Sequence, residues 1–296
     1  MIAGPTETAT NAEVSRLVVV SNRLPVVLSR NNGEWVVKPG AGGLVTALAP
    51  VLRDRGGTWI GWPGTSETES VSDALTEAAT DTGYTLEPVP LSDDLINGYY
   101  HGFSNEVIWP LFHDFPERAN YQPSYWKAYQ DANRTFATCI SESTSPRDYV
   151  WVHDYHLMDV AAQLRTIDVR RRTGFFLHIP FPSVDLFMRL PWRFQILSAL
   201  LEFDMLGFQT ARDTRNFIHC VRTVIDGVRV SGRNASFTVD LPDRRTSVGT
   251  FPIGIDARYF EQTARDSEVE QEVRMSHDRL PNIKVILGVD RLDYSK

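Results

Sequence analysis

The chain has 296 residues, of which 42% are hydrophobic and 23% charged, which is enough apolar material for a large core and more than one domain. Its net charge of −7 argues against a nucleic acid or an anionic membrane as the main partner, and no apolar stretch approaches the ~20 residues that a membrane helix needs. The two cysteines, Cys139 and Cys220, lack metal-ligand spacing, so we expect buried free thiols in a reducing, cytoplasmic compartment rather than disulfides or a zinc site.

The chain begins with a polar tail that leads into a strand. Residues 1–15 are small and polar and lack the order of a signal peptide, which predicts a flexible tail. Residues 17–20 predict a buried strand that ends in Ser21-Asn22-Arg23. A glycine-rich turn at 40–43 then leads into a helix start at 44–49. Backbone N–H groups at such a turn can bind an anion, although the pattern alone is typical of an ordinary turn.

Strands and helices alternate through the middle of the chain. Strands are predicted at residues 58–61, 84–89, 149–152 and 174–177, and helices at 121–140, 157–165, 191–201 and 211–226. This alternation predicts an α/β fold with a doubly wound, mainly parallel, Rossmann-like sheet. Polar residues follow four of the predicted strands: Arg23, Asp154, His178 and Arg291. Because ligands of open α/β sheets bind beyond the carboxyl ends of the strands, these residues are candidates for one site.

The last part of the chain predicts the start of a second domain. Residues 228–250 indicate a surface hairpin or loop, and we expect the first domain to span 16–253 and the second 254–296. The second domain would begin with a helix at 257–280 and a strand at 284–289. A strand with no following helix leaves a crossover unfinished, which predicts that this domain is incomplete.

Two cations follow the last predicted strand. Arg291 offers a planar fork and Lys296 a compact point charge, a combination that suits a diphosphate. Isolated cations at a strand end are also typical of a solvated surface, so these two residues alone do not identify a site.

A series of short motifs occurs in order across residues 16–296. They are Ser21-Asn22-Arg23, Gly42-Gly43-Leu44, Trp59-Ile60-Gly61-Trp62, Tyr99-Tyr100 through Trp109-Pro110, His153-Asp154-Tyr155-His156, Phe175 through Pro182, Leu206 through Thr210, Pro252 through Ile255, and Arg291 through Lys296. Together they closely resemble the trehalose-6-phosphate synthase family. That family has the glycosyltransferase B-type fold, in which two Rossmann-like domains face a cleft. The resemblance implies an amino-terminal acceptor domain at 16–253 and the start of a donor domain at 254–296.

The resemblance also implies a reaction. Family members transfer glucose from a nucleotide diphosphate sugar, such as UDP-glucose, to glucose 6-phosphate, and the product is trehalose 6-phosphate formed with retention. They need no cofactor, and no metal-ligand cluster in the sequence argues otherwise. In the front-face mechanism ascribed to the family, the leaving phosphate takes the acceptor proton. Family members commonly self-associate, so a homo-oligomer is one of the oligomeric states that the sequence leaves open.

The same resemblance assigns roles to single residues. It implies catalytic roles for Asp154, His178, Arg291 and Lys296. It implies contacts with glucose 6-phosphate by Arg23, Trp62, Tyr100, Trp109 and Asp154, and contacts with the donor by Gly43, His178, Arg291 and Lys296. Hydroxyl and indole N–H groups can donate hydrogen bonds while the rings cover sugar faces. We expect Tyr99 to be structural, and His153 and His156 to be hydrogen-bonded within their loop.

Two alternatives remain open at the level of the sequence. The chain could be a non-catalytic sugar-phosphate-binding or regulatory fragment, which an abrupt end after Lys296 favours. It could also be a related glycosyltransferase with another polyol-phosphate acceptor. The donor base cannot be read, since the residues that discriminate UDP from GDP or ADP are expected beyond Lys296.

Overall fold

The computed structural model describes residues 16–31, 34–40, 42–280, 283–290 and 292–295. The chain divides into two compact units between Phe251 and Pro252. Nowhere in the described ranges does a helix combine the length and the apolar character that crossing a bilayer requires.

The first unit is built on a nine-stranded sheet with the strand order β5-β4-β1-β6-β7-β8-β11-β10-β9. Its strands are β1 (Leu17–Arg23), β4 (Gly57–Trp62), β5 (Thr85–Pro88), β6 (Tyr149–His153), β7 (Arg172–Leu177), β8 (Met205–Phe208), β9 (Arg229–Arg233), β10 (Ser236–Asp240) and β11 (Arg245–Thr250). The strands from β5 through β11 in this order are parallel, and β10 and β9 add an antiparallel edge. The predicted α/β fold with a mainly parallel sheet is confirmed.

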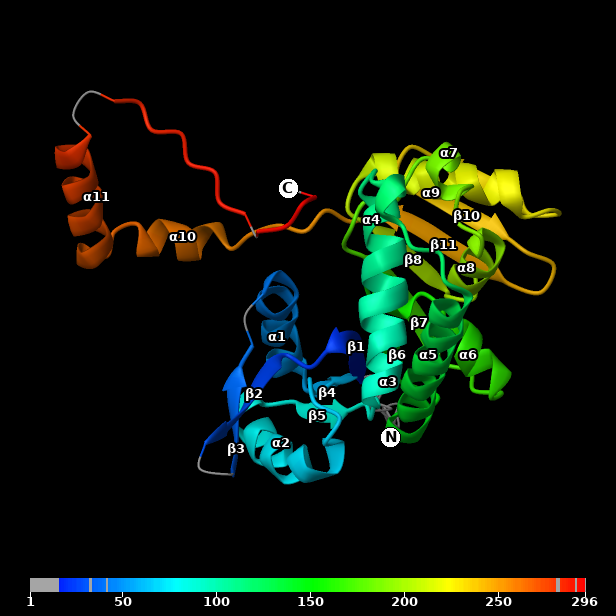
Figure 1. Ribbon diagram of the computed structural model, residues 1–296, viewed down its shortest axis with the longest axis horizontal. Helices are drawn as coiled ribbons and strands as arrows, with labels where there is room; N and C mark the ends of the chain where they lie inside the picture. The colour runs from blue at the N-terminus through cyan, green and yellow to red at the C-terminus, as the bar shows by residue number, and fades with distance from the viewer. Residues whose placement is uncertain (1–15, 32–33, 41, 281–282, 291, 296) are drawn as a thin grey trace, which may run out of the picture. The chain divides into compact units, whose positions relative to one another are not determined.

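Helices cover both faces of this sheet. They are α1 (Gly43–Arg55), α2 (Thr68–Thr82), α3 (Asp93–Ile96), η1 (Asn97–Ile108), α4 (Trp109–Phe112), η2 (Pro116–Arg118), α5 (Pro123–Ser143), η3 (Tyr155–Leu157), α6 (Val160–Thr166), α7 (Val184–Phe187), α8 (Arg193–Leu200) and α9 (Ala211–Val224). Side chains of β1 alternate between the faces: Val19 packs in the hydrophobic cluster that contains α1 and α2, whereas Val18 and Val20 pack in the cluster that contains η1 and α5. Figure 1 shows α1 and α2 beside β1 and β4, away from α5.

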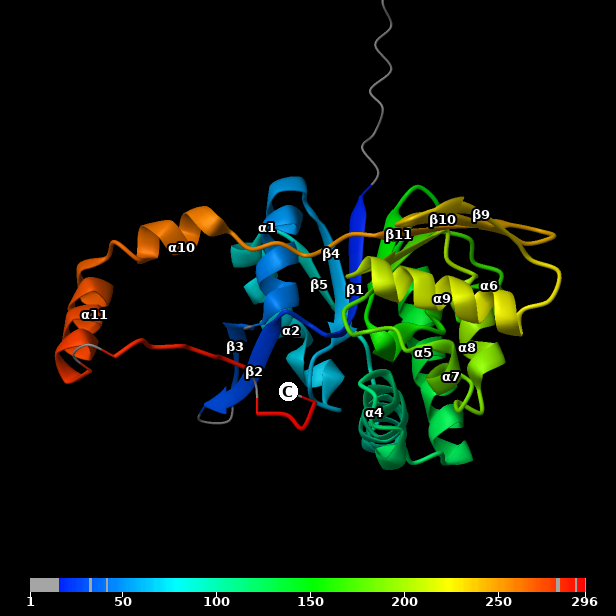
Figure 2. The ribbon, with the colours of Figure 1, turned by 90° about the horizontal axis from the view of Figure 1, so that it is seen from above.

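The strand order reverses at β1 and β6. From β1 the chain moves outward to β4 and β5 on one side, and from β6 it moves outward to β7 and β8 on the other. In β1, Val20 pairs with Ile60 of β4 and with Val152 of β6, so the carboxyl ends of the three strands lie at the same edge. Figure 2 shows β1 and β4 beside each other from above. Ligands of open α/β sheets bind at such a reversal.

Several elements were not predicted or were predicted in another form. The hairpin β2 (Val26–Asn31) and β3 (Glu34–Pro39), helix α2, the π-helix η1 and the short strand β8 were not predicted. The segment 228–250, predicted as a surface hairpin or loop, forms three consecutive antiparallel strands, β9, β10 and β11, and β11 also pairs with β8 of the parallel sheet. Strand β11 joins the sheet because Thr246 and Val248 alternate toward the core.

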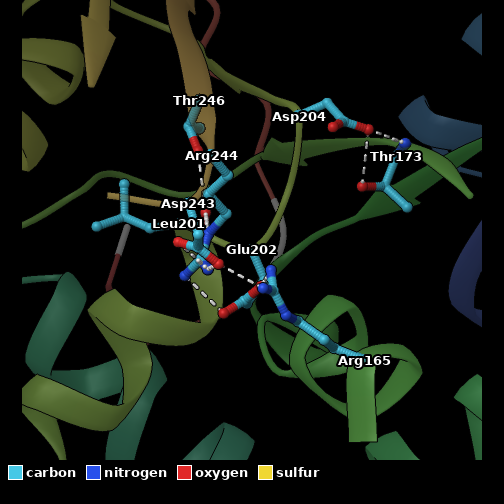
Figure 3. Close-up of polar contacts among 8 residues, drawn as sticks. All are labelled: Arg165, Thr173, Leu201, Glu202, Asp204, Asp243, Arg244 and Thr246. Atoms are coloured by element: carbon cyan, nitrogen blue, oxygen red, sulfur yellow. Dashed lines mark hydrogen bonds and ion pairs between the residues drawn. The ribbon is translucent and has the colours of Figure 1, made fainter. Parts of the chain in front are cut away.

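A closed ring of charges fastens the antiparallel edge to the helices (Figure 3). Arg165 of α6 bonds Glu202 at 2.8 Å and also bonds Asp243, while Arg244 bonds the same two carboxylates at 2.6 and 3.1 Å. Arg244 also donates to the carbonyl of Leu201 at 2.9 Å. Because each charge has two partners of opposite sign, the turn between β10 and β11 is held against α6 and the end of α8.

The second unit contains α10 (Ala257–Thr263) and α11 (Ser267–Arg279). The prediction of one helix over 257–280 is therefore wrong, because the helix is interrupted at 264–266. The predicted strand at 284–289 is also not formed, and Ile286 is 97% exposed. A parallel strand exists only by hydrogen bonding to neighbouring strands, and no described residue after Phe251 belongs to one.

Candidate active site

Asp154 lies immediately after β6 in a strained backbone conformation. Its φ of 75° and ψ of 166° fall in a region that residues other than glycine rarely adopt. Its Oδ1 accepts hydrogen bonds from the N–H groups of Tyr155, at 3.0 Å, and His178, at 3.2 Å. Its own N–H donates to the carbonyl of Phe176 at 2.8 Å. The carboxylate is thus held between the ends of β6 and β7, at the edge where the predicted site should lie.

His178 forms a pair with His153. The Nε2 atom of His178 lies 3.1 Å from Nδ1 of His153, so one N–H is shared between the two rings. Burial lowers the pKa of His178 to about 4, and burial followed by the proximity of His178 lowers the pKa of His153 well below its usual range. Both imidazoles are therefore neutral near pH 7. His153 was expected to bond within its own loop; it instead bonds across to the end of β7.

Arg23 lies at the end of β1 against the indole of Trp62. Its guanidinium carbon is 4.6 Å from the centre of the ring, which is cation–π geometry. Gly64, at φ 96°, leaves room for this guanidinium, with which any Cβ would collide. Burial lowers the pKa of Arg23, but a guanidinium stays charged at pH 7. The indole N–H of Trp62 donates to the carbonyl of Thr65 at 3.0 Å, so Trp62 offers a ring face and not the predicted donor.

Tyr100 and Trp109 meet the loop after β6 through aromatic contacts. The Tyr100 ring lies 6.2 Å from that of Trp62 and stacks on His156 at 5.6 Å and 13°. Trp109 lies 5.6 Å from Tyr155, whose ring is 3.9 Å from His156. A continuous aromatic cluster therefore connects Trp62, Tyr100 and Trp109, which are distant in the sequence.

His156 is 8% exposed and lies within this cluster. Neither of its ring nitrogens has a hydrogen-bond partner among the residues that the structure describes, and burial lowers its pKa to about 3. The expectation of a hydrogen-bonded His156 is wrong, because stacking on Tyr100 holds the ring instead. Tyr99 is fully buried and donates to Oδ1 of Asn22 at 2.9 Å, which agrees with the structural role predicted for it.

A pocket of about 380 Å³ joins several of these groups to the start of α1. Arg23, Gly43, Asp154 and His156 are among its lining residues. Helix α1 begins at Gly43, and its N-cap, Gly42 at φ 144°, provides no side-chain hydrogen bond. The N–H groups of the first turn and the helix dipole are thus available to an anion beside the pocket.

The structure does not place every predicted site residue. Arg291 and Lys296 lie outside the described residues. Within the part of the chain that is described, no group of three or more His, Cys, Asp or Glu side chains could hold a metal ion. Cys139 and Cys220 are buried free thiols, as predicted, and burial raises the pKa of each to about 12.

Sequence reasoning missed some members of the site. Asn22 lines the pocket beside Arg23, and its position after a buried strand could have identified it. Gly64 carried no comparable signal, because its importance depends on contact with Arg23, which is far away in the sequence.

Comparisons with known proteins bear on this site. The family model for glycosyltransferase family 20 matches residues 15–296. The trehalose-6-phosphate synthase of Mycolicibacterium vanbaalenii is 42% identical over 285 residues, which cover 94% of this chain and 58% of that protein. The chain therefore spans little more than half the length of the curated relatives that it matches.

Two solved structures share the fold. An alpha,alpha-trehalose-phosphate synthase (UDP-forming) from Burkholderia xenovorans, in complex with glucose-6-phosphate, is 29% identical with a TM-score of 0.71 and matches 89% of this chain and 56% of its own. A structure from E. coli, bound with UDP-2-fluoro glucose, is 33% identical with a TM-score of 0.77 and matches 95% of this chain and 58% of its own.

Proposed function

Because the chain belongs to glycosyltransferase family 20, we propose that the protein transfers glucose from a nucleotide diphosphate sugar, UDP-glucose first among them, to glucose 6-phosphate. The product is trehalose 6-phosphate, formed with retention. The names of the relatives and the two ligands bound in the solved structures support this reaction. The observation that carries the proposal is the pocket at the β1/β6 reversal, which joins Arg23, Gly43 and Asp154.

The acceptor binds against the first unit in this proposal. Arg23 provides positive charge for the phosphate, and the rings of Trp62, Tyr100 and Trp109 surround the sugar. Arg23 suits this role because Trp62 and Gly64 already fix its guanidinium, so little side-chain entropy is lost on binding. Asp154 accepts hydrogen bonds from sugar hydroxyls, since its carboxylate is anchored through Oδ1.

The donor diphosphate binds at the start of α1. Gly43 lets the sugar nucleotide approach the bare backbone, and the first-turn N–H groups stabilise the charge that develops on the leaving oxygen. His178, neutral and bonded through Nε2 to His153, uses its other nitrogen to bind the donor glucose. We also assign Arg291 and Lys296 to binding of the donor diphosphate, and residues 254–296 to the start of the donor domain, as the family resemblance implies.

The chemical step is a front-face substitution. The bond between the anomeric carbon and the diphosphate oxygen breaks, and the acceptor hydroxyl oxygen forms a new bond to that carbon on the same face. The departing phosphate oxygen takes the hydroxyl proton, so that the nucleotide diphosphate and trehalose 6-phosphate are the products. Asp154 positions and polarises the reactants and does not attack. A covalent glucosyl adduct on Asp154, detected by mass spectrometry after incubation with donor, would contradict this mechanism.

Calorimetric titration followed by a turnover assay tests the proposed function. The chain is expected to bind glucose 6-phosphate and UDP-glucose separately, and to release UDP only when both are present. Binding of glucose 6-phosphate without donor binding or turnover would instead identify a non-catalytic sugar-phosphate-binding chain. A chain that binds neither compound would overturn the assignment of both subsites.

A further inference from the structure

The π-helix η1 presents a face that an α-helix could not. In a π-helix each N–H bonds the carbonyl five residues earlier, and the N–H of Trp109 indeed donates to the carbonyl of Ser104. Residues four or five apart therefore lie on the same face. Tyr100, Asn105 and Trp109 are separated by five and then four positions, so that Asn105 falls between the two aromatic residues that the proposed function places on the acceptor.

Contacts across the helix confirm this shared face. Tyr100 stacks on His156 and Trp109 contacts Tyr155, two consecutive residues after β6. Asn105 meets the same pair, because the hydroxyl of Tyr155 donates to its Oδ1 at 3.2 Å. The carboxamide is thereby oriented: its oxygen is occupied, and its Nδ2 group has no hydrogen-bond partner among the described residues.

The side chains around this amide supply hydrogen-bond donors that suit an anion. The carboxylate next to it in the sequence, Glu106, is bonded to Asn120 at 2.8 Å and Tyr125 at 3.2 Å. The shared face thus presents the hydroxyl of Tyr100 and the amide of Asn105, both of which can donate. A sugar hydroxyl needs both donors and acceptors, whereas a phosphate needs donors only.

We propose that Nδ2 of Asn105 donates a hydrogen bond to the phosphate of the acceptor and so helps the site to select a sugar phosphate. This inference rests on the proposed function, because it takes glucose 6-phosphate as the ligand of the face that Tyr100 and Trp109 form. Asn105 is a binding residue in this assignment, and Tyr155 is the residue that orients it.

Substitution Asn105→Asp provides the sharpest test. It preserves size and leaves an oxygen to accept from Tyr155, but it replaces the N–H₂ donor with negative charge. The dissociation constant for glucose 6-phosphate, measured by calorimetry on the full chain at about 0.05 M salt, should rise at least about tenfold. Asn97→Asp makes the same chemical change at an exposed position of η1 and should leave that constant unchanged within about twofold.

Salt identifies the group that the amide contacts. Salt screens the repulsion between the introduced carboxylate and a phosphate. The deficit in glucose 6-phosphate affinity of Asn105→Asp, relative to the parent chain, should therefore shrink severalfold at about 0.5 M salt. A deficit that does not depend on salt would assign the amide to a sugar hydroxyl and overturn the phosphate contact. Asn105→Ala, which removes the donor without adding charge, should show a smaller deficit and serves if the aspartate variant does not fold.

The acceptor site and the role of Asn105 within it are contradicted by different results. If the parent chain binds glucose 6-phosphate and Asn105→Asp binds it equally well, the inference is wrong while the proposed acceptor site stands. If the parent chain does not bind glucose 6-phosphate at all, the proposed function is wrong and this inference falls with it.

Discussion

Asp154 combines a backbone conformation that costs about 1–3 kcal/mol with a carboxylate anchored by two N–H groups. Such strain persists only where the surroundings fix it, and here β6, β7 and the loop after β6 do so. The strain lies in the backbone, whereas ligand binding would involve the carboxylate. A substitution that alters only the side chain therefore tests binding separately from stability. Asparagine has the same shape as aspartate and retains an acceptor oxygen for both N–H groups, so it can occupy the position with little change in fold.

Asp154→Asn should therefore change binding and leave stability nearly unchanged. The free energy of unfolding should stay within about 1 kcal/mol of the parent value, since both anchoring hydrogen bonds can form. The dissociation constant for glucose 6-phosphate should rise about tenfold or more, because a hydrogen bond to a charged group is lost. Chemical denaturation and calorimetry measure the two quantities; unaltered affinity would exclude Asp154 from the acceptor site.

Gly43→Ala tests the donor subsite in a similar way. A Cβ at this position would meet no atom within 4 Å, and alanine is the better helix former, so stability should be unchanged or rise by up to about 1 kcal/mol. The added methyl group would nevertheless occupy the space through which a diphosphate approaches the first turn of α1. UDP-glucose affinity should fall at least about tenfold with glucose 6-phosphate affinity unaltered. A variant that binds the donor normally would remove Gly43 from the diphosphate site.

At the scale of elements, the packing of η1 against α5 depends on glycine. A Cβ at Gly102 would lie 2.6 Å from Cδ1 of Tyr125, which is far closer than packed atoms allow. Gly102→Ala should therefore destabilise the protein by about 1–3 kcal/mol despite its better helix propensity. Because η1 carries Tyr100, affinity for glucose 6-phosphate should fall in the same variant. Gly254→Ala, where a Cβ meets nothing within 4 Å, is the matched control for denaturation; equal stability of the two variants would contradict the packing argument.

The elements also show how far the sequence determines this fold. Strands such as β1 and β6 were predictable, because short apolar runs rich in β-branched residues are typical of buried parallel strands. The π-helix η1 was not, since its residues repeat on a period that amphipathic patterns do not test. The segment 284–289 has a strand-like sequence but forms no strand, because strand formation requires a partner strand.

The candidate site, like the fold, could be predicted from the sequence only in part. Arg23 and Asp154 follow buried strands, so their common edge could be inferred from the sequence. Neither the pairing of His153 with His178 nor the stacking of His156 on Tyr100 could be inferred, because each depends on the relative placement of separate elements. To predict that Trp109 lies near Trp62 and Tyr100, one would have to know that η1 is a π-helix with i→i+5 hydrogen bonds.

For the whole molecule, buried histidines predict how stability depends on pH. Burial lowers the pKa of His178 to about 4, that of His156 to about 3 and that of His153 well below 6.5. Between pH 6.5 and these values the unfolded chain binds more protons than the folded one, so stability is lost as pH falls below about 6.5. Asp159 opposes this loss, because burial raises its pKa to about 6 and it gains stability as pH falls through that value.

The three histidines together outweigh one carboxylate, so the melting temperature should be several degrees lower at pH 5 than at pH 7.5. Thermal unfolding followed by circular dichroism at both values measures this difference. His156→Phe, which keeps a ring to stack on Tyr100, should reduce the difference. A melting temperature that rises on acidification would show that these imidazoles are not buried as neutral groups.

The central position of β1 also governs the order in which the protein can fold as it is synthesised. One side of β1 pairs with β4 soon afterwards, but the other pairs with β6, with Leu17 opposite Tyr149. At ~5–20 residues per second, a ribosome needs on the order of ten seconds to make the roughly 130 intervening residues. For that interval the Leu17–Val20 segment has an unpaired hydrogen-bonding edge at which another chain could pair.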